Sequence, residues 1–242
     1  MSSIDPIKFE VIRNALLEAT EEMAIALRRS AYSTNIKTRA DFSCAFFDRY
    51  LRPVAQAFTQ PVHLGSLTIL TPRAVREYGP ENLGEGDAIL VNDPYRGGVH
   101  LNDITLIAPV YCGGELFGYV ANLAHHVDVG GGAPASIGAF QQVYQEGIII
   151  PPVKLVEEGE IAADVFELVI AQIRSKRETR GDFRAQVAAN FKCASRRTSS
   201  ATSSQSACVG IAPLNSAGLT PSPSCQTWVK HTRRGPKGSP ET

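Results

Sequence analysis

Apolar residues recur along the chain with two different periods, which predicts both helices and strands. Between Pro6 and Arg29 they return at helical spacing, and Asp5 followed by Pro6 suits the start of a helix. The repeating positions in this first helix are Phe9, Ile12, Leu16, Met23 and Leu27. Further helices are predicted over residues 66–78, 164–173 and 180–190.

Shorter apolar runs bounded by turn residues predict strands. The segments D-F-S-C-A-F-F-D and L-R-P-V-A-Q-A flank the turn Arg49–Tyr50 and predict a hairpin. Residues 87–92, 104–111 and 116–123 predict three more strands, and a Gly-Gly turn joins the last two. Because strands and helices mix without a repeating βαβ order, we expect an α+β fold with a mixed sheet and flanking helices.

The chain changes composition near Phe191. Residues 1–191 hold 23 acidic and 17 basic residues, a net charge of −6, whereas residues 192–242 hold seven basic residues and one acidic residue, a net charge of +6. The later part is rich in Ser, Thr, Pro and Gly and lacks periodicity, so it cannot bury enough apolar surface to offset its ordering entropy. We predict a folded region, 1–191, and a disordered tail, 192–242. The abrupt change suggests a shift of reading frame, and a native basic linker is the alternative.

Composition excludes several other classes of protein. A hydrophobic content of 43% and a net charge of zero are typical of a globular protein and do not indicate binding to nucleic acid. No apolar run is long enough to cross a membrane, and the first residues do not form a signal peptide. No C-x-x-C pair occurs, which excludes a zinc ribbon, and Cys44 and Cys112 lie in apolar runs typical of buried thiols. These features favour a reducing, cytoplasmic setting.

Potential chemistry is concentrated between Asn92 and Gly132. One predicted strand leads into N-D-P-Y-R-G-G-V-H-L-N-D, and another ends in A-H-H-V-D-V-G-G-G. If these strands are neighbours, both turns lie at one edge of the sheet and their side chains converge on one divalent ion. Imidazoles with carboxylates favour Mn²⁺, Zn²⁺, Fe²⁺ or Mg²⁺. Neighbouring strand residues face opposite ways, so only one of His125 and His126 is expected in the site, and we prefer His125. The predicted ligands are Asp93, His100, Asp103, His125 and Asp128.

A structural role for these residues is the main alternative. Asp and Asn cap turns without any metal, and glycine runs form nests of backbone amides for an anion. Neither a Walker A motif nor a dinucleotide fingerprint occurs, so no nucleotide site is expected. Asp41, His63 and Glu146 are weaker candidates, because each lies at an element end where a turn, an interior hydrogen bond or a cap explains it. No G-x-S-x-G elbow and no Cys beside a His supports nucleophilic catalysis.

Several motifs in this order resemble the hydantoinase B/oxoprolinase family. They are D-F-S-C-A-F-F-D, P-V-H-L-G-S, N-D-P-Y-R-G-G-V-H-L-N-D, A-H-H-V-D-V-G-G and E-G-I-I-I-P-P. The resemblance runs from about Ile4 to Asn190. It implies ATP-dependent opening of a cyclic amide, as in N-methylhydantoinase and 5-oxoprolinase, or carboxylation of a ketone, as in acetone carboxylase. It also implies a hydantoinase A-type partner subunit that binds ATP, and a manganese ion near the segments Asp93–Asp103 and His125–Asp128.

Family subunits are much longer, so the resemblance implies an N-terminal fragment. The A-H-H-V-D motif is more similar to the hydantoinase and oxoprolinase branch than to the ketone carboxylases. We therefore expect a subunit of an ATP-dependent cyclic-amide hydrolase, in which the metal orients the ring carbonyl while the partner subunit handles ATP. A subunit of an acetone or acetophenone carboxylase, and a truncated non-catalytic remnant, are the alternatives.

Overall fold

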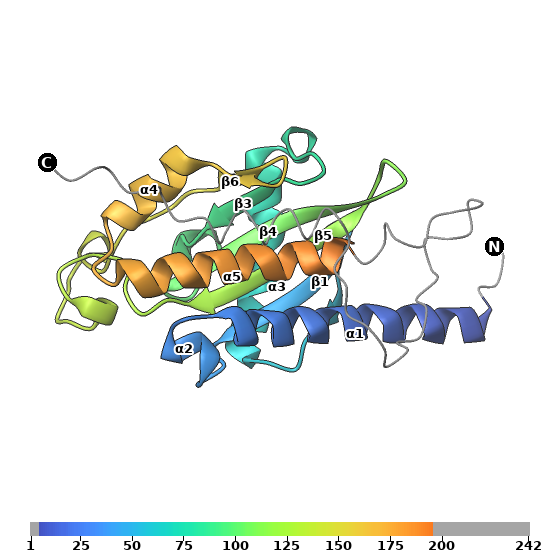
Figure 1. Cartoon of the computed structure of the whole chain (residues 1–242), viewed down its shortest axis with the longest axis horizontal. Helices are drawn as coiled ribbons and strands as arrows, with labels where there is room; N and C mark the ends of the chain where they lie inside the picture. Colours follow the sequence, from blue (N-terminus) through green and yellow to red (C-terminus); the bar gives the residue numbers. More distant parts are fainter. Residues whose placement is uncertain (1–4, 196–242) are drawn as a thin grey trace, which may run out of the picture. The chain divides into compact units, whose positions relative to one another are not determined.

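A computed structural model describes residues 5–195 of the 242-residue chain. Within this range seven strands form one sheet in the order β2-β1-β5-β4-β3-β6-β7, with helices on both faces (Figure 1). The predicted α+β class is confirmed. Every strand pair is antiparallel, so the expectation of a mixed sheet was wrong. Hairpins connect β1 to β2, β4 to β5 and β6 to β7, which only antiparallel pairing permits.

The strands are β1 (Phe42–Asp48), β2 (Pro53–Gln56), β3 (Ala88–Val91), β4 (Asp103–Cys112), β5 (Glu115–His125), β6 (Val153–Glu157) and β7 (Glu160–Ile161). The helices are α1 (Pro6–Ser30), α2 (Thr34–Lys37), α3 (Pro61–Tyr78), α4 (Ala163–Ala171) and α5 (Lys176–Ser195). Short 3₁₀ turns cover η1 (Pro80–Asn82), η2 (Pro94–Arg96), η3 (Pro134–Ser136) and η4 (Val143–Gln145).

Most predicted elements are present, with shifted ends. The hairpin across Arg49–Tyr50 and the strands β3, β4 and β5 are confirmed. The helix predicted to begin at Ser66 begins five residues earlier, at Pro61, where the missing proline N–H costs no hydrogen bond. The short elements α2, β6 and β7 were not predicted, because a few residues carry too little periodicity to be recognised.

Helix α3 packs on one face of the sheet, while α1 and α5 lie on the other (Figure 1). Leu67 and Leu70 of α3 are fully buried against Phe47 and Ile107 of the sheet. Each such leucine contributes about 1.5–3 kcal/mol to folding. Because both faces are covered, the central strands are apolar along nearly their whole length.

Polar side chains attach α5 to the sheet. The Asn122 carboxamide donates to the Gln186 carbonyl at 2.9 Å and to the side chain of Asn190 at 2.8 Å. Gln186 donates to the carbonyl of Ile104 at 2.9 Å, and Asn190 donates to that of Leu106 at 3.1 Å. All three polar residues are fully buried, so this network fixes the register of α5 on β4 and β5.

Helix α5 runs to Ser195, so residues 192–195 of the predicted tail are helical. The rest of that tail lies outside the described residues. Between residues 5 and 195, no helix combines the length and apolar character needed to span a membrane. Cys44 is fully buried, as predicted, whereas Cys112 at the tip of the β4–β5 hairpin is partly exposed.

Candidate metal centre

Strand register brings three candidate residues to one edge of the sheet. Asp103 opens β4 and pairs directly across the ladder with His125, the last residue of β5. On the other side of β5, Phe42 pairs with Ala124, and the His125 amide donates to the Asp41 carbonyl at 3.0 Å. The antiparallel register of three adjacent strands therefore places Asp41, His125 and Asp103 side by side.

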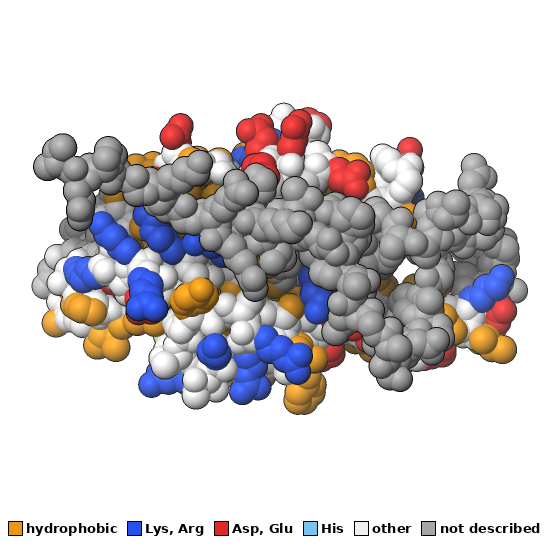
Figure 2. Space-filling model, viewed as in Figure 1, with side chains coloured by type: hydrophobic (Ala, Val, Ile, Leu, Met, Phe, Trp, Pro, Cys, Tyr) orange, Lys and Arg blue, Asp and Glu red, His pale blue; other side chains and the backbone are white. Residues whose placement is uncertain are grey.

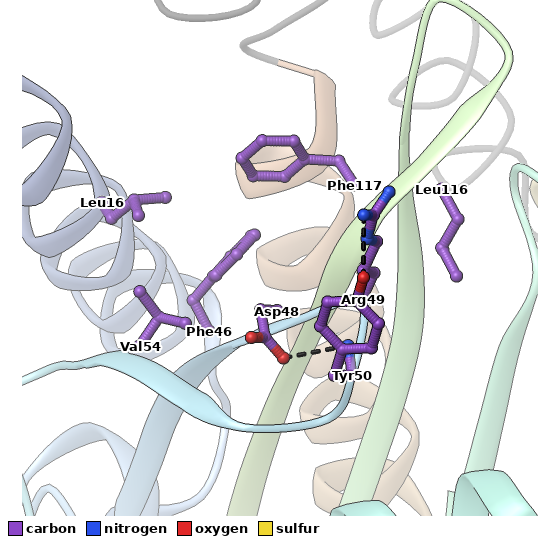
Figure 3. Close-up of a pocket in the computed structure, with 8 residues that line it drawn as sticks. All are labelled: Leu16, Phe46, Asp48, Arg49, Tyr50, Val54, Leu116 and Phe117. Carbon is purple, nitrogen blue, oxygen red and sulfur yellow. Dashed lines mark hydrogen bonds between the residues drawn. The ribbon is translucent and has the colours of Figure 1, made fainter. Parts of the chain in front are cut away.

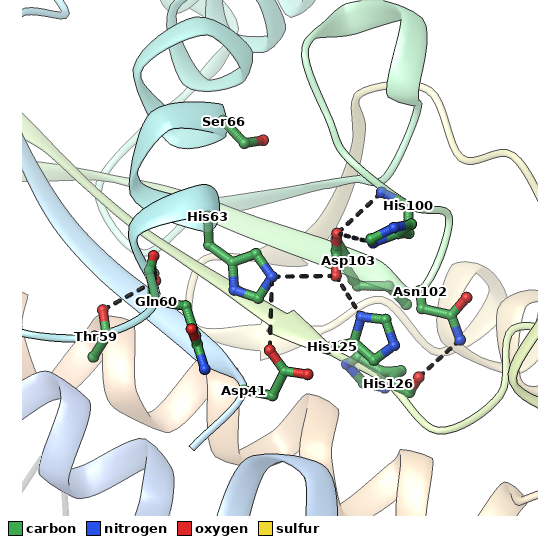
Figure 4. A network of polar contacts seen from close by, with 12 residues as sticks. Asp41, Thr59, Gln60, His63, Ser66, His100, Asn102, Asp103, His125 and His126 are labelled. Carbon is green, nitrogen blue, oxygen red and sulfur yellow. Dashed lines mark hydrogen bonds and ion pairs between the residues drawn. The ribbon is translucent and has the colours of Figure 1, made fainter. Parts of the chain in front are cut away.

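Asp103 is the centre of the cluster (Figure 4). Its carboxylate is completely buried and contacts His125 Nδ1 at 2.7 Å through Oδ1. Through Oδ2 it contacts His100 Nδ1 at 3.2 Å and accepts the His100 backbone N–H at 3.0 Å. Each of His100, Asp103 and His125 offers one ligand atom, and these atoms lie within 4.8 Å of one another. The donor set and its compactness fit one divalent ion of the kind that two imidazoles and a carboxylate bind.

His63 and Asp41 border this cluster. His63 lies in the first turn of α3, and its Nε2 is 3.6 Å from Asp103 Oδ1 and 3.7 Å from Asp41 Oδ1. Burial lowers the pKa of His63 below its usual value, although the carboxylates of Asp103 and Asp41 oppose this. Nδ1 of His63 has no hydrogen-bond partner among the described residues.

The pKa values of the two central groups, Asp103 and His125, are shifted in opposite directions. Burial acts to raise the pKa of Asp103, but the hydrogen bond with His125 and the charges of His63 and His125 outweigh it, so this pKa lies below its ordinary value. Burial acts to lower the pKa of His125, but the hydrogen bond and charge of Asp103 outweigh it and raise this pKa. A metal cation bound here would stabilise the negative charge of the Asp103 carboxylate, as the imidazole protons do without it.

Asp93 lies outside this cluster. Its Oδ1 accepts the Tyr95 amide at 2.9 Å, so the side chain caps the turn η2. Its Oδ2 forms an ion pair with Arg96, whose guanidinium also binds Glu77 through contacts of 2.6 and 2.7 Å. Asp93 therefore has the turn-capping role that was the structural alternative to metal binding.

Asp128 is also engaged elsewhere. Its two carboxylate oxygens accept the backbone N–H of Arg174 at 2.6 Å and the Arg174 guanidinium at 2.9 Å. The same guanidinium donates to the carbonyls of Gly130 and Gly131. The Gly130 amide donates to Asp128 Oδ1 and the Gly132 amide donates to the Gln145 carbonyl, so neither amide is available to bind an anion. Arg174 thus organises the glycine-rich turn.

His126 points away from the cluster, as strand alternation predicts. It is fully buried on the α5 side, where Nε2 contacts Gln186 Oε1 at 2.9 Å and the ring lies tilted against Phe183, with centroids 4.8 Å apart. The structure therefore brings together three of the five predicted ligands, His100, Asp103 and His125. Asp41 and His63, the weaker candidates, border the cluster, and their closeness to it depends on the β1–β5 register and on α3, which no local motif reveals. Glu146 is partly exposed, and no hydrogen bond joins it to the cluster in the described chain.

Comparison with known proteins shows the family of the chain. The sequence profile of the Hydantoinase B/oxoprolinase family matches residues 5–205. An uncharacterised protein of Methanocaldococcus jannaschii is 47% identical over 188 residues, covering 76% of this chain and 33% of its own length. A 5-oxoprolinase of Dictyostelium discoideum is 36% identical over 192 residues, covering 79% of this chain and 15% of its own length.

Solved structures show the same fold. The ATP-dependent caprolactamase of Pseudomonas jessenii matches with a TM-score of 0.74 at 34% identity, over 79% of this chain and 33% of that chain. Acetone carboxylase matches with a TM-score of 0.72 at 20% identity, over 78% of this chain and 25% of that chain, a likeness of fold alone. This chain therefore spans a third or less of each of these relatives, and it belongs to the Hydantoinase B/oxoprolinase family.

Proposed function

We propose that this chain supplies the metal centre of an ATP-dependent complex that opens a cyclic amide. One observation carries the proposal: in a member of this family, two imidazoles and a buried carboxylate present ligand atoms within 4.8 Å of one another at the end of the sheet. The resemblance of the chain to 5-oxoprolinase and caprolactamase supports a lactam or hydantoin-like ring as substrate. Because the chain spans a third or less of these relatives, turnover is proposed for the complete complex.

The proposed ligands are His100, Asp103 and His125. Asp103 orients both imidazoles through its hydrogen bonds, which holds the rings before any ion binds. A divalent ion bound here would polarise the carbonyl of the ring. The His100 side chain is 62% exposed and Asp103 is fully buried, so the ring would approach from the His100 side.

Asp93 and Asp128 are not included in this proposal, because arginine side chains neutralise both. His63 stands behind the ligand set, and its Nε2 lies 3.6 Å from Asp103 Oδ1 and 3.7 Å from Asp41 Oδ1. The proposed role of His63 is to hold the Asp103 carboxylate in place, and that of Asp41 is to orient the His63 ring.

We propose that a hydantoinase A-type subunit binds ATP. The sequence contains no Walker A motif, and the name of one similar protein, caprolactamase subunit beta, indicates an assembly of unlike subunits. ATP hydrolysis would then occur on the partner, while this chain positions the ring amide.

The test is to assemble the complete complex, in which this chain is joined to the remainder of a B-type subunit and co-purified with an A-type subunit, and to measure metal content and ATP hydrolysis. We expect one equivalent of metal, and ATP hydrolysis that depends on oxoproline, hydantoin or caprolactam. His125→Ala should lose both, whereas Asp128→Asn should retain its metal. No ring-dependent ATP hydrolysis, or equal metal content in wild type and His125→Ala, would refute the proposal. Bicarbonate incorporation from acetone in place of ring opening would assign the carboxylase reaction instead.

A further inference from the structure

Helix α5 buries a stripe of polar side chains. Asp182, Gln186 and Asn190 follow one another at intervals of four residues, so they lie on one face of the helix, and all three are buried. The outward side of the helix already carries charge, because Lys and Arg side chains gather on the surface over its first turns (Figure 2). Solubility therefore does not explain the stripe, and each buried amide costs free energy unless its hydrogen bonds are made.

Backbone carbonyls fix the orientation of the amides in this stripe. A carbonyl can only accept, so the end of the Asn190 side chain that faces the Leu106 carbonyl at 3.1 Å is its NH₂ group. The Asn190 oxygen then accepts from Asn122 at 2.8 Å, while the second N–H of Asn122 donates to the Gln186 carbonyl at 2.9 Å. The Asn122 oxygen accepts from the Gln186 side chain at 2.8 Å. The other N–H of Gln186 donates to the Ile104 carbonyl at 2.9 Å, so both of its N–H groups are used and only Oε1 remains.

This remaining oxygen determines which nitrogen of His126 carries a proton. Gln186 Oε1 lies 2.9 Å from His126 Nε2, and because a carboxamide oxygen cannot donate, the imidazole carries a hydrogen on Nε2. His126 Nδ1 is buried and has no hydrogen-bond partner among the described residues. Within the described chain, Gln186 therefore makes the one hydrogen bond that holds this ring, and the chain of amides behind it sets the direction of that bond.

The backbone of His126 is joined to the strand that carries Asp103. Its N–H donates to the Asn102 carbonyl at 2.8 Å, and its carbonyl accepts from the Asn102 carboxamide at 2.9 Å (Figure 4). Asn102 directly precedes Asp103, and His126 directly follows His125. These two hydrogen bonds therefore continue the pairing of β4 with β5 one step beyond the Asp103–His125 pair.

Gln186 thus contacts both strands of the proposed metal centre from the α5 face of the sheet. Through Nε2 it holds the Ile104 carbonyl, one residue after Asp103, and through Oε1 it holds the ring of His126, one residue after His125. We propose that Gln186 is a positioning residue of the metal centre, whose single carboxamide sets the separation of Asp103 and His125 through their neighbours. This inference rests on the proposed metal site. Because successive strand residues face opposite sides of the sheet, Gln186 itself would not contact the ion.

The test measures the Kd of the full 242-residue chain for Mn²⁺, from the electron paramagnetic resonance signal of the unbound ion. Gln186→Met keeps the length of the side chain but removes its hydrogen bonds, so we expect a Kd about tenfold higher. Asn190→Leu is the matched control, because it also removes a buried amide, one turn further along α5, but contacts no neighbour of a ligand. It should bind Mn²⁺ as wild type does. Urea unfolding without metal shows whether each variant is folded.

A second readout separates positioning from a purely structural role. Co²⁺ bound in place of Mn²⁺ has a visible absorption spectrum that reports the geometry of its ligands, and this spectrum should change in Gln186→Met and not in Asn190→Leu. An unchanged Kd and spectrum in Gln186→Met, or equal changes in both variants, overturns the positioning role and leaves the metal centre standing. A wild-type chain that binds no Mn²⁺ overturns the metal centre itself, and this inference with it.

If either variant does not fold, the wild-type chain decides. Nuclear magnetic resonance of the imidazole nitrogens should find the hydrogen of His126 on Nε2, and binding of Zn²⁺ should shift that signal, because the ring is joined to both ligand strands. A hydrogen on Nδ1 alone, or a signal that bound Zn²⁺ does not move, overturns the proposal.

Discussion

Replacing Asp103 by Asn should abolish stabilisation by metal while leaving the shape of the site nearly unchanged. Asp103 is completely buried and contacts both candidate histidine ligands. An ion that binds only the folded state stabilises it by about 2.7 kcal/mol at a concentration one hundred times its Kd. For a folded region of this size, that corresponds to a rise in Tm of roughly 5–11 °C.

The amide keeps the volume of the carboxylate but removes its charge and one acceptor oxygen. If the Kd for metal rises a hundredfold, the same concentration stabilises the variant by only about 0.4 kcal/mol, or less than about 2 °C. Each protein serves as its own reference, because the measured quantity is the difference in unfolding free energy with and without metal. Any structural cost of the substitution therefore cancels.

The assay is urea unfolding followed by circular dichroism, with Mn²⁺ or with chelator. Manganese is preferred to zinc because thiolates compete for it less. Asp93→Asn is the matched control, since Asp93 pairs with Arg96 away from the cluster, and it should keep the full effect of Mn²⁺. An undiminished metal effect in Asp103→Asn, or its loss in Asp93→Asn, would show that the three-ligand assignment is incorrect.

Three further predictions concern stability. Asn92→Ala should lower the unfolding free energy by about 3 kcal/mol, because the buried carboxamide makes three hydrogen bonds, to the Leu101 and Ile148 carbonyls and to the Ile150 amide. Urea unfolding measures this free energy, and Asn14→Ala at an exposed position of α1 is the control that should change it little. Burial acts to raise the pKa of Asp87, but hydrogen bonds, first from Lys154, lower it overall. This contribution is present above about pH 4 and is lost as pH falls through the folded-state pKa, so Asp87→Asn should be less stable near neutrality and show a flatter stability profile in acid. Gly97→Ala should lower Tm, because φ is +116° and a Cβ atom would lie 2.7 Å from Ile69.

The sequence predicted the long elements well because their periodicity is local. The β4–β5 hairpin follows from two apolar runs around a Gly-Gly turn, and its register then places Asp103 opposite His125. The same local rules could not distinguish Asp103, a proposed metal ligand, from Asp93 and Asp128, whose carboxylates bind backbone amides and arginines, because all three follow or begin strands in glycine-rich segments. Their arginine partners differ in distance along the chain. Arg96 is three residues from Asp93, whereas Arg174 is 46 residues from Asp128, and only the fold reveals that contact.

The proposed metal site draws on one short part of this chain. The three proposed ligands lie within 26 consecutive residues, and one hairpin fixes two of them, so we expect the ligand set to form without residues from the rest of a longer subunit. An apolar hollow lined by Leu16, Phe46 and Phe117 lies toward the opposite ends of the same strands (Figure 3): β5 begins at Glu115 beside the hollow and finishes at His125 in the cluster. At about 3.4 Å per residue, the ten steps of β5 separate the two regions by roughly 34 Å. Substitutions in the first turns of α1, which reaches the hollow through Leu16, would therefore leave the proposed ligands in place. Consequently, the double variant Phe9→Ser, Ile12→Ser should retain metal-dependent stabilisation, which His125→Ala should lose.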